Sequence, residues 1–575
     1  MTDTTRDELT DTSRALGELA TEAWDGSMAA FPLYATSLGD RRHLSDLNPN
    51  DAGAEEREVS RLRDLLARTA AIPEDRLRAG DRVTRLALID ALEYELGLVE
   101  SHTTTWTIDP LDGPQVQLVN VESYQPIETP ADGRAAIERW RAMGPWIDRH
   151  VDGIRTGLVE GRVSPLGLVD KVIEELDDLL ALPVESWPLA SPAAIQRPDW
   201  PVSEAEAFAR DLLAAVRDAI RPAFAREREF LVRELRGRAR SNDRPGLSHV
   251  PGGDEAYARL VRAHTSLDLG PDEIHAIGLA EVARIDAEFE ELGAAVLGAR
   301  DRAATLARLR TDPDLYFRTA DEVKETAEAS LDRANAAIAG WFGRLPIAAC
   351  QVVVMGDHES KHSTIAYYRQ PAADGSRPGS YYINTSLPET RPRYEAETLA
   401  FHESVPGHHL QIAIAQELDG LPDFRRFDGP TAFIEGWALY IERVAEEMGL
   451  YSGDLDRFGI LSFDAWRACR LVVDTGLHAF GWSRDRSMAY MVEHTALAEN
   501  NIVNEVDRYI AIPGQALAYK LGQVEILRLR AMAEEALGDR FDIRAFHDAV
   551  LGEGAVGLRT LRGTIATWLE AQRQA

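Results

Sequence analysis

The stretch FHESVPGHHLQ, Phe401–Gln411, holds three of the fourteen histidines of this chain and one glutamate within eight residues. It begins like the HExxH motif, in which two histidines four residues apart lie on one face of a helix and bind one zinc ion. Four residues after His402, however, stands Pro406. On an unbroken helix His402 and His408 would lie about 9 Å apart along the axis, too far to share one ion.

The surroundings of this stretch favour a helix that is interrupted. YEAETLA precedes it and LQIAIAQELDG follows it, with Gly420 as a C-cap. Removing Pro406-Gly407 leaves HESVH, so we interpret the pair as an insertion that returns His408 to the position of the second ligand. His409, about 100° further round the helix, is the alternative ligand. The alternative without a metal is that Pro406-Gly407 is a kink between two surface helices and that the histidines have no shared role.

A formally complete motif, HESKH, lies upstream at His358–His362. It follows a β-like run and precedes STIAYY, so its surroundings favour a loop between two strands. Because HExxH requires a helix, we predict that Phe401–Gln411 binds the metal. HESKH is then expected to be a polar loop near the site.

The third zinc ligand is predicted on the next helix, PTAFIEGWALYIERVAEEMG, which begins near Pro430. Glu435 and Glu442 are seven residues apart and therefore share a face. Both lie among apolar residues, where a carboxylate needs a partner such as a metal or a metal-binding histidine. We expect Glu435 to be a ligand and Glu442 to support one of the histidines; solvated acids are the alternative.

Helical spacing of apolar residues dominates the rest of the chain. The segments predicted as helices are 54–100, 131–184, 203–238, 254–266, 271–298 and 319–342, and most of the chain after 385. Between them, 347–385 contains AACQVVVM, STIAYYRQ and GSYYINT, which are rich in β-branched and aromatic residues. The sequence therefore predicts a mainly α fold with one small sheet just before the histidine-rich stretch.

Composition narrows the class of protein. The chain has 575 residues, with 45% hydrophobic and 27% charged, and a net charge of −32. This charge disfavours binding to nucleic acid or to anionic membranes. Two cysteines exclude a disulfide framework, and MTDTTRDELTDTSRALGELA lacks the features of a signal peptide. We expect a cytoplasmic protein; the sequence leaves its oligomeric state open.

Several segments together resemble a known bacterial family. FHESVPGHHLQ, AFIEGWALYIER and NEVDRYIAIPGQALAYKLGQ resemble a family of uncharacterised proteins marked by HExxPGHH, over roughly residues 115–575. That family is similar to the helical zinc peptidases of the thimet oligopeptidase, carboxypeptidase Taq and angiotensin-converting enzyme type. The resemblance implies a two-lobed helical shell around a deep channel, with 1–250 as the N-terminal lobe and 251–575 as the catalytic lobe. The sheet at about 347–385 and the zinc-site helices at about 394–449 would lie in the second lobe.

The resemblance also implies roles for individual residues. It assigns Glu435 as the third zinc ligand and makes SYYINT, with Tyr382 and Asn384, the edge strand that pairs with a peptide substrate. Tyr519 is the candidate for stabilising the oxyanion, with core packing as the alternative. Arg508 and Tyr509 are candidates for binding a substrate carboxylate, and pairing of the arginine with a nearby acid is the other possibility.

These observations predict a zinc metallohydrolase, most simply a peptidase that cleaves short peptides. His402, His408 and Glu435 would hold Zn²⁺, and Glu403 would act as the general base. The alternatives are a zinc hydrolase of a non-peptide amide or amino-acid conjugate, and a non-catalytic helical binding protein whose metal site the Pro-Gly insertion has spoiled.

Overall fold

Helices build almost the whole molecule. The computed structural model describes residues 3–356, 360, 364–372, 375 and 377–574. The helices before the sheet are α1 (Asp3–Ala30), α2 (Pro32–Ser37), α3 (Ala54–Ala70), α4 (Ala79–Glu100), α5 (Pro114–Asn120), α6 (Pro130–Val159), α7 (Leu166–Ala181), α8 (Ser191–Ala194), α9 (Val202–Ala215), α10 (Arg221–Phe230), α11 (Gly253–Thr265), α12 (Pro271–Leu292), α13 (Arg302–Thr311) and α14 (Ala320–Ala337). The expected mainly α class is thereby confirmed.

The helices after the sheet include those that carry the histidine-rich stretch. They are α16 (Arg393–Glu403), α17 (His408–Gln416), α18 (Asp423–Phe427), α19 (Thr431–Glu447), α20 (Arg457–His478), α21 (Arg484–His494), α22 (Glu499–Ala511), α23 (Leu517–Leu537), α24 (Ile543–Leu551) and α25 (Leu558–Gln574). Pro430 directly precedes α19, as expected for a residue that fixes the start of a helix.

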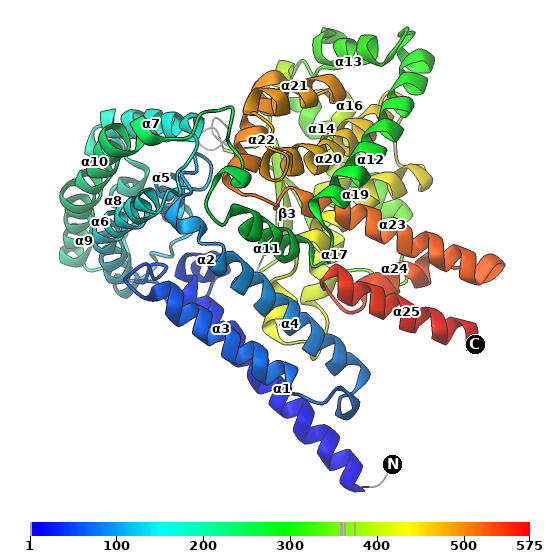
Figure 1. The fold of residues 1–575 in the computed structure, drawn as a ribbon, viewed down its shortest axis with the longest axis horizontal. Coiled ribbons are helices and arrows are strands. Elements are labelled where there is room, and N and C mark those ends of the chain that lie inside the picture. The colour runs from blue at the N-terminus through cyan, green and yellow to red at the C-terminus, as the bar shows by residue number, and fades with distance from the viewer. Residues whose placement is uncertain (1–2, 357–359, 361–363, 373–374, 376, 575) are drawn as a thin grey trace.

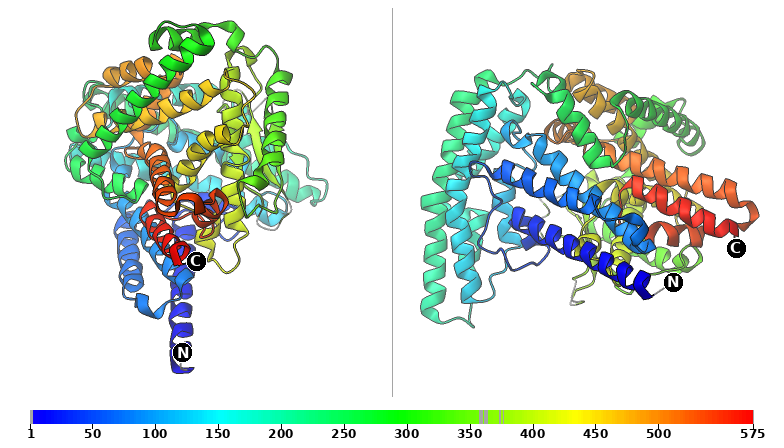
Figure 2. Two further views of the ribbon diagram at one scale, coloured as in Figure 1. Left: turned by 90° about the vertical axis from the view of Figure 1, so that its right-hand side faces the viewer. Right: turned by 60° about the horizontal axis from the view of Figure 1, so that its bottom comes forward.

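The helices gather in two groups. Helices α5 to α10 lie on one side of the molecule, and α12, α14, α16, α17 and α19 to α25 lie on the other, where β3 is seen among them (Figure 1). A second view shows α6, α9 and α10 as one upright layer (Figure 2). This layer has its own cluster of buried apolar side chains, which includes Trp140, Trp187 and Phe224. The boundary at residue 250 and the deep channel between lobes stay predictions.

The N-terminal helices also contact the C-terminal end of the chain. Asp90 of α4 accepts hydrogen bonds from Arg559 at 2.6 Å and from Thr560 at 2.7 Å, both in α25. Phe424 of α18 packs against the apolar cluster that α1, α3 and α4 share. The N-terminal helices therefore contact both the last helix of the chain and the short helix that follows α17.

The predicted sheet is present and has three strands, β1 (Cys350–Val354), β2 (Ala366–Arg369) and β3 (Gly379–Ile383). Their order is β1-β3-β2; β1 runs parallel and β2 antiparallel to β3. The expectation that β3 is an edge strand is therefore wrong. Its backbone groups pair on both sides, so β1 and β2 form the edges.

The upstream HESKH motif lies outside the described residues, except for Ser360. Its predicted loop conformation stays a prediction.

Two glycines bring together the helices that carry other predicted residues. A Cβ atom on Gly436 of α19 would lie 2.5 Å from Cα of Gly522 of α23. Only glycine allows this approach, and it fixes α23 against the helix that bears Glu435.

Candidate metal centre

A turn between α16 and α17 interrupts the histidine-rich stretch as predicted. Helix α16 ends at Glu403, and α17 begins at His408. The N–H of His409 donates to the carbonyl of Ser404 at 3.1 Å across the turn, and the peptide bond before Pro406 is cis. The four intervening residues form a compact turn between two helices.

The turn depends on glycine and on a tryptophan from α19. A Cβ atom on Gly407 would lie 2.0 Å from the carbonyl oxygen of His402, so a larger residue does not fit. The indole Nε1 of buried Trp437 donates to the carbonyl of Pro406 at 3.1 Å. Helix α19 therefore holds the turn in place through a residue that lies two positions after Glu435.

The turn brings His402 and His408 together with Glu435. One potential ligand atom from each of these three residues lies within 4.8 Å of the other two. Nε2 of His402 is 3.6 Å from Oε2 of Glu435, and Nε2 of His408 is 3.7 Å from the same oxygen. The two imidazole rings are nearly perpendicular, with their centroids 4.7 Å apart.

These separations fit the donor set of a zinc site. Two ligand atoms about 2.1 Å from a tetrahedral ion are about 3.4 Å from each other. The two nitrogen–oxygen distances of 3.6 and 3.7 Å are close to this value. Two imidazoles and one carboxylate are also a ligand combination that zinc hydrolases use, with a fourth position left for water or substrate. The residues present therefore fit the ion.

Glu442 orients His402. Nδ1 of His402 and Oε1 of Glu442 are 2.8 Å apart, and both side chains are buried, with 4% and 1% of their surface exposed. This contact leaves Nε2 directed toward Glu435. A carboxylate on the second nitrogen is the usual partner of a metal-binding histidine. Nδ1 of His408, in contrast, is buried without a hydrogen-bond partner among the described residues.

His409 points away from this cluster, toward the sheet. Its Nδ1 is 3.0 Å from the hydroxyl of Tyr368, and its Nε2 is 3.0 Å from the carbonyl of Ala348. Burial lowers the pKa of His409 to about 4. Gly379 makes room for the ring, because a Cβ there would lie 2.4 Å from Nδ1. The two adjacent histidines thus have different surroundings: His408 faces His402, and His409 attaches α17 to the sheet.

Glu403 lies between the cluster and strand β2. Burial and the charge of Glu435 raise the pKa of Glu403 to about 7, although the charge of His402 has the opposite effect. The carboxylate of Glu403 accepts a hydrogen bond from the backbone N–H of Tyr368. The N–H of Asn384 donates to the carbonyl of Ile365, so these two residues form a hydrogen-bonded pair of the antiparallel ladder. Such pairs alternate along the strands, so Tyr368, three residues further, faces Tyr381 in a non-hydrogen-bonded pair. Its N–H therefore points away from β3. The edge of β2 that is opposite β3, and that pairs with no other strand among the described residues, therefore faces Glu403.

Asn384 and Tyr382 are not arranged as an edge that could bind substrate. The side-chain amide of Asn384 donates to the carbonyl of Ser360 at 2.7 Å, and its oxygen accepts from the hydroxyl of Ser386 at 2.6 Å. Tyr382 stacks on Tyr367, with ring centroids 4.7 Å apart. Both residues thus support the loop and sheet next to the site.

Arg508 and Tyr509 belong to an internal network around Glu505. Nη2 of Arg508 lies 3.1 Å from Oε2 of Glu505, and the hydroxyl of Tyr509 donates to the same oxygen at 2.7 Å. Arg470 pairs with Glu505 at 3.0 Å and covers the ring of Tyr519 at 4.3 Å. The pairing of an arginine with a nearby acid, one of the two expectations for Arg508, is therefore what the structure contains.

The sequence reasoning missed Arg467, a buried arginine of α20. Its side chain lies over the ring of Trp466 at 4.1 Å, and its charge lowers the pKa of Glu435 and of Glu403. The signal was available in LSFDAWRACRLVV, where two arginines three residues apart interrupt an apolar run. An arginine in such a run is buried and needs a partner.

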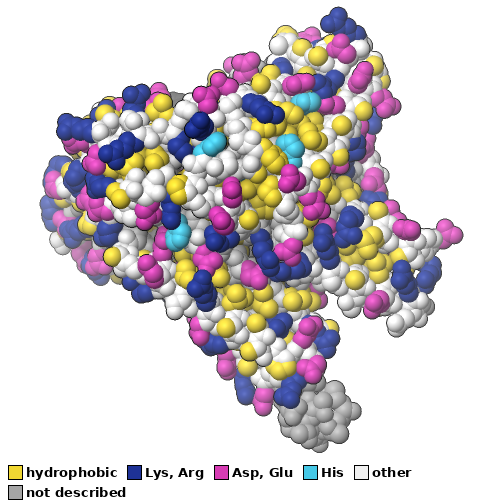
Figure 3. Space-filling view, in the orientation of Figure 1, with side chains coloured by type: hydrophobic (Ala, Val, Ile, Leu, Met, Phe, Trp, Pro, Cys, Tyr) yellow, Lys and Arg dark blue, Asp and Glu magenta, His cyan; other side chains and the backbone are white. Residues whose placement is uncertain are grey.

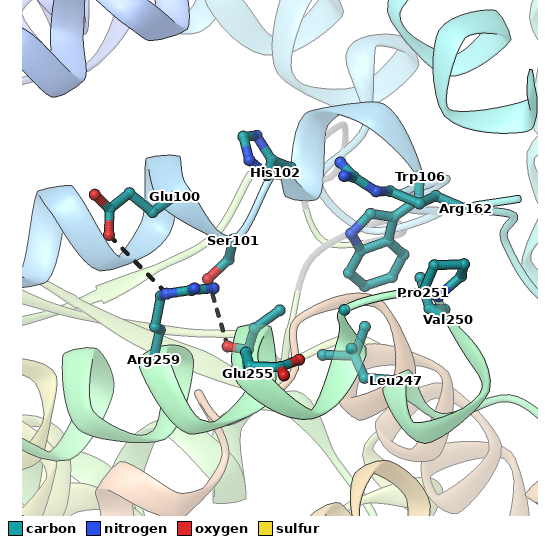
Figure 4. A pocket seen from close by; sticks show the side chains of 13 residues that line it. Glu100, Ser101, His102, Trp106, Arg162, Leu247, Val250, Pro251, Glu255 and Arg259 are labelled. Atoms are coloured by element: carbon teal, nitrogen blue, oxygen red, sulfur yellow. Dashed lines mark hydrogen bonds and ion pairs between the residues drawn. The ribbon is translucent and has the colours of Figure 1, made fainter. Parts of the chain in front are cut away.

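Other surfaces of the molecule are separate from this cluster. A cavity of about 350 Å³ between α4 and α11 is lined by residues such as Glu100, Trp106 and Arg259 and contains none of the predicted site residues (Figure 4). Acidic and basic side chains are interspersed over the face shown in Figure 3. Within the described part of the chain, every helix is too short or too polar to cross a lipid bilayer.

Comparisons with other proteins agree with this fold. The family model described as bacterial protein of unknown function (DUF885) matches residues 32–565. A candidate lipoprotein from Colwellia psychrerythraea has 28% identity and a TM-score of 0.90, over 97% of this chain and 99% of that one. A candidate lipoprotein of unknown function from Shewanella oneidensis shares the fold, with 16% identity and a TM-score of 0.72, over 96% and 99%. No protein with a curated description matches the chain.

The comparisons overturn one expectation from the sequence. A cytoplasmic location is contradicted, because the similar protein from Colwellia psychrerythraea is described as a candidate lipoprotein, a class that is anchored to a membrane. The relationship to helical zinc peptidases stays a prediction. Since the family model covers nearly the whole sequence, the chain belongs to the DUF885 family of bacterial proteins of unknown function.

Proposed function

We propose that this protein is a zinc-dependent hydrolase of peptide bonds. The observation that carries the proposal is the convergence of His402, His408 and Glu435, whose potential ligand atoms lie within 4.8 Å of one another. Nε2 of each histidine and a carboxylate oxygen of Glu435 would hold the ion. Bound there, zinc would polarise the scissile carbonyl and activate a water molecule.

The residues of the chain would divide the remaining work. Glu403 would accept a proton at its carboxylate and deliver it to the leaving amine, and a pKa of about 7 suits both directions of transfer. Glu442 would hold the tautomer of His402 in which Nε2 is free. Tyr519, which lies beside Arg470, is the candidate donor to the oxyanion.

The free edge of β2 supports an extended peptide as the substrate. Tyr368 directs its backbone groups out of the sheet on the side of Glu403. Its N–H is used by Glu403, so an extended chain added along β2 would pair with this residue through its carbonyl. Main-chain pairing orients a peptide without requiring a particular side chain. A short or unfolded peptide therefore suits the site better than a folded protein.

The test combines metal analysis with hydrolysis. Protein purified from zinc-replete medium is expected to contain one zinc per chain and to cleave members of a peptide library. Glu403→Gln should retain the zinc and lower kcat by about 10²- to 10⁴-fold, because the general base is lost. Glu447→Gln, an exposed glutamate of α19 paired with Arg530, is the matched control and should leave both unchanged.

Two results would refute the proposal. One is less than stoichiometric zinc in the wild-type protein under these conditions, which points to a binding protein with a spoiled metal site. The other is full zinc occupancy with a Glu403→Gln variant that hydrolyses peptides as fast as the wild type.

A further inference from the structure

Arg467 is a buried cation whose donors are unused. Only 6% of the residue is exposed, and its Nε and Nη1 atoms have no hydrogen-bond partner among the described residues. Phe463 and Trp466 lie against the guanidinium, with ring centroids 4.7 and 4.1 Å from its central carbon. Aromatic contact stabilises the face of a guanidinium but leaves its N–H edge unsatisfied.

The neighbouring Arg470 and Arg508 each pair with a carboxylate, although each also has one buried guanidinium nitrogen without a hydrogen-bond partner. Arg467 has two such nitrogens and, among the described residues, no carboxylate partner. Arg470 pairs with Glu505 at 3.0 Å, and Arg508 pairs with the same carboxylate at 3.1 Å. Burying a guanidinium without a partner opposes folding, and its fork-shaped edge matches a carboxylate. The unused edge of Arg467 is therefore the feature that requires a ligand.

Contacts along α19 and α20 connect Arg467 to the histidine cluster. Glu442 contacts His402 at 2.8 Å, and the next residue, Arg443, pairs with Asp464 of α20 at 2.5 Å. Arg467 is one helical turn after Asp464. The charge of Arg467 also acts on Glu435, on Glu442 and on His408, so the guanidinium lies on the side of the cluster that faces α20.

We propose that Arg467 binds a carboxylate of the substrate while the scissile bond lies at His402, His408 and Glu435. The substrates would then be peptides with a negative charge just beyond the bond that is cut, from a free C-terminus or from an acidic side chain. This inference rests on the proposed hydrolase function, and it gives that function a substrate class.

A purely electrostatic role is the alternative, because Arg467 also offsets the charges of Glu403, Glu435 and Glu442. The two roles differ in one measurable respect. A residue that only balances charge affects all substrates alike, whereas a residue that binds a carboxylate distinguishes a peptide acid from its amide.

The experiment compares N-acetyl dipeptides as free acids, as C-terminal amides, and as amides with aspartate at the last position. Wild-type enzyme should hydrolyse the acids with a kcat/KM about 10- to 100-fold above that of the plain amides, as loss of one charge-assisted pair predicts. The aspartyl amides identify the source of the charge. If they match the acids, a side-chain carboxylate suffices; if they match the plain amides, the C-terminus is required.

Variants then assign the preference to Arg467. Arg467→Gln should lower kcat/KM for the acids by the same factor and leave the plain amides within about threefold. Arg467→Lys, which keeps the charge without the fork, should fall between. The control is Arg457→Gln on the same helix, where the arginine is 43% exposed and pairs with Glu446. If Arg467→Gln does not fold, Arg467→Lys makes the assignment, and equal rates for acids and plain amides on wild-type protein would still overturn it.

Binding provides a readout that does not need turnover. Calorimetric titration of zinc-loaded Glu403→Gln protein should show tighter binding of N-acetyl-Phe-Phe than of its amide, and the difference should vanish when Arg467→Gln is added. Equal binding and equal hydrolysis of acid and amide, or an equal loss on both in Arg467→Gln, overturns the assignment. Absence of hydrolysis with the binding preference intact refutes only the proposed function.

Discussion

The contact between His402 and Glu442 makes a quantitative prediction about metal affinity. Nδ1 and Oε1 are 2.8 Å apart, and both side chains are at least 96% buried, so solvent cannot replace the carboxylate. Partners of this kind contribute a factor of about 10–100 to metal affinity, or about 1.4–2.8 kcal/mol. Glu442→Gln keeps an acceptor oxygen but loses the charge, and we expect an increase of about tenfold in the zinc Kd.

Glu442→Ala removes the acceptor as well and leaves a buried imidazole N–H without a partner. We expect its zinc Kd to rise by about 100-fold, with a further loss of stability. Competition with a chromogenic chelator measures both constants, with Glu447→Gln as the control from the exposed end of the same helix. An unchanged Kd in both Glu442 variants, in protein that remains folded, would refute the role given to this contact.

Two further predictions concern stability. Gly379→Ala should lower the free energy of unfolding by about 1–3 kcal/mol, since its Cβ would lie 2.4 Å from Nδ1 of His409, whereas Gly340→Ala has open space and should have little effect on packing. Burial raises the pKa of Glu227 in α10 to about 8 from 4.5, so the folded protein keeps a proton that the unfolded chain releases. The free energy of unfolding should therefore decrease as pH rises from about 4.5 to about 8. Denaturant titrations should show a smaller decrease in Glu227→Gln, and an unchanged decrease in Glu229→Gln, which replaces an exposed residue of the same helix. A Gly379→Ala protein as stable as Gly340→Ala, or an unchanged pH slope in Glu227→Gln, would contradict these arguments.

Local sequence patterns were sufficient for much of the fold. Helical periodicity marked the segments around α3, α6 and α12, and β-branched and aromatic runs marked the three strands. The order of the strands was not predictable in the same way. Whether GSYYINT pairs on one side or on both depends on where β1 and β2 lie in space, which no local pattern records.

The candidate site shows a similar division. His402, His408 and Glu435 were accessible from the sequence because they lie within 34 residues of one another, on α16, α17 and α19. The burial of Arg467 could be read from its apolar run, but its position near the cluster could not, because α20 approaches the cluster only through tertiary packing. The network around Glu505 was missed for the same reason: it joins α20 to α22, and the sequence alone offered Arg508 two roles without deciding between them.

Gly407 has a consequence for how such sites are recognised. Its Cβ position is filled by the carbonyl oxygens of His402 and Phe401, so the turn tolerates no side chain there. A spacing of four residues between two metal-binding histidines is needed only when both lie on one unbroken helix. The positions of the two ligand atoms around an ion do not by themselves require that spacing. A search for candidate metal sites that requires that interval would miss this chain, in which a turn containing a proline and a glycine brings two histidines together although they are six residues apart.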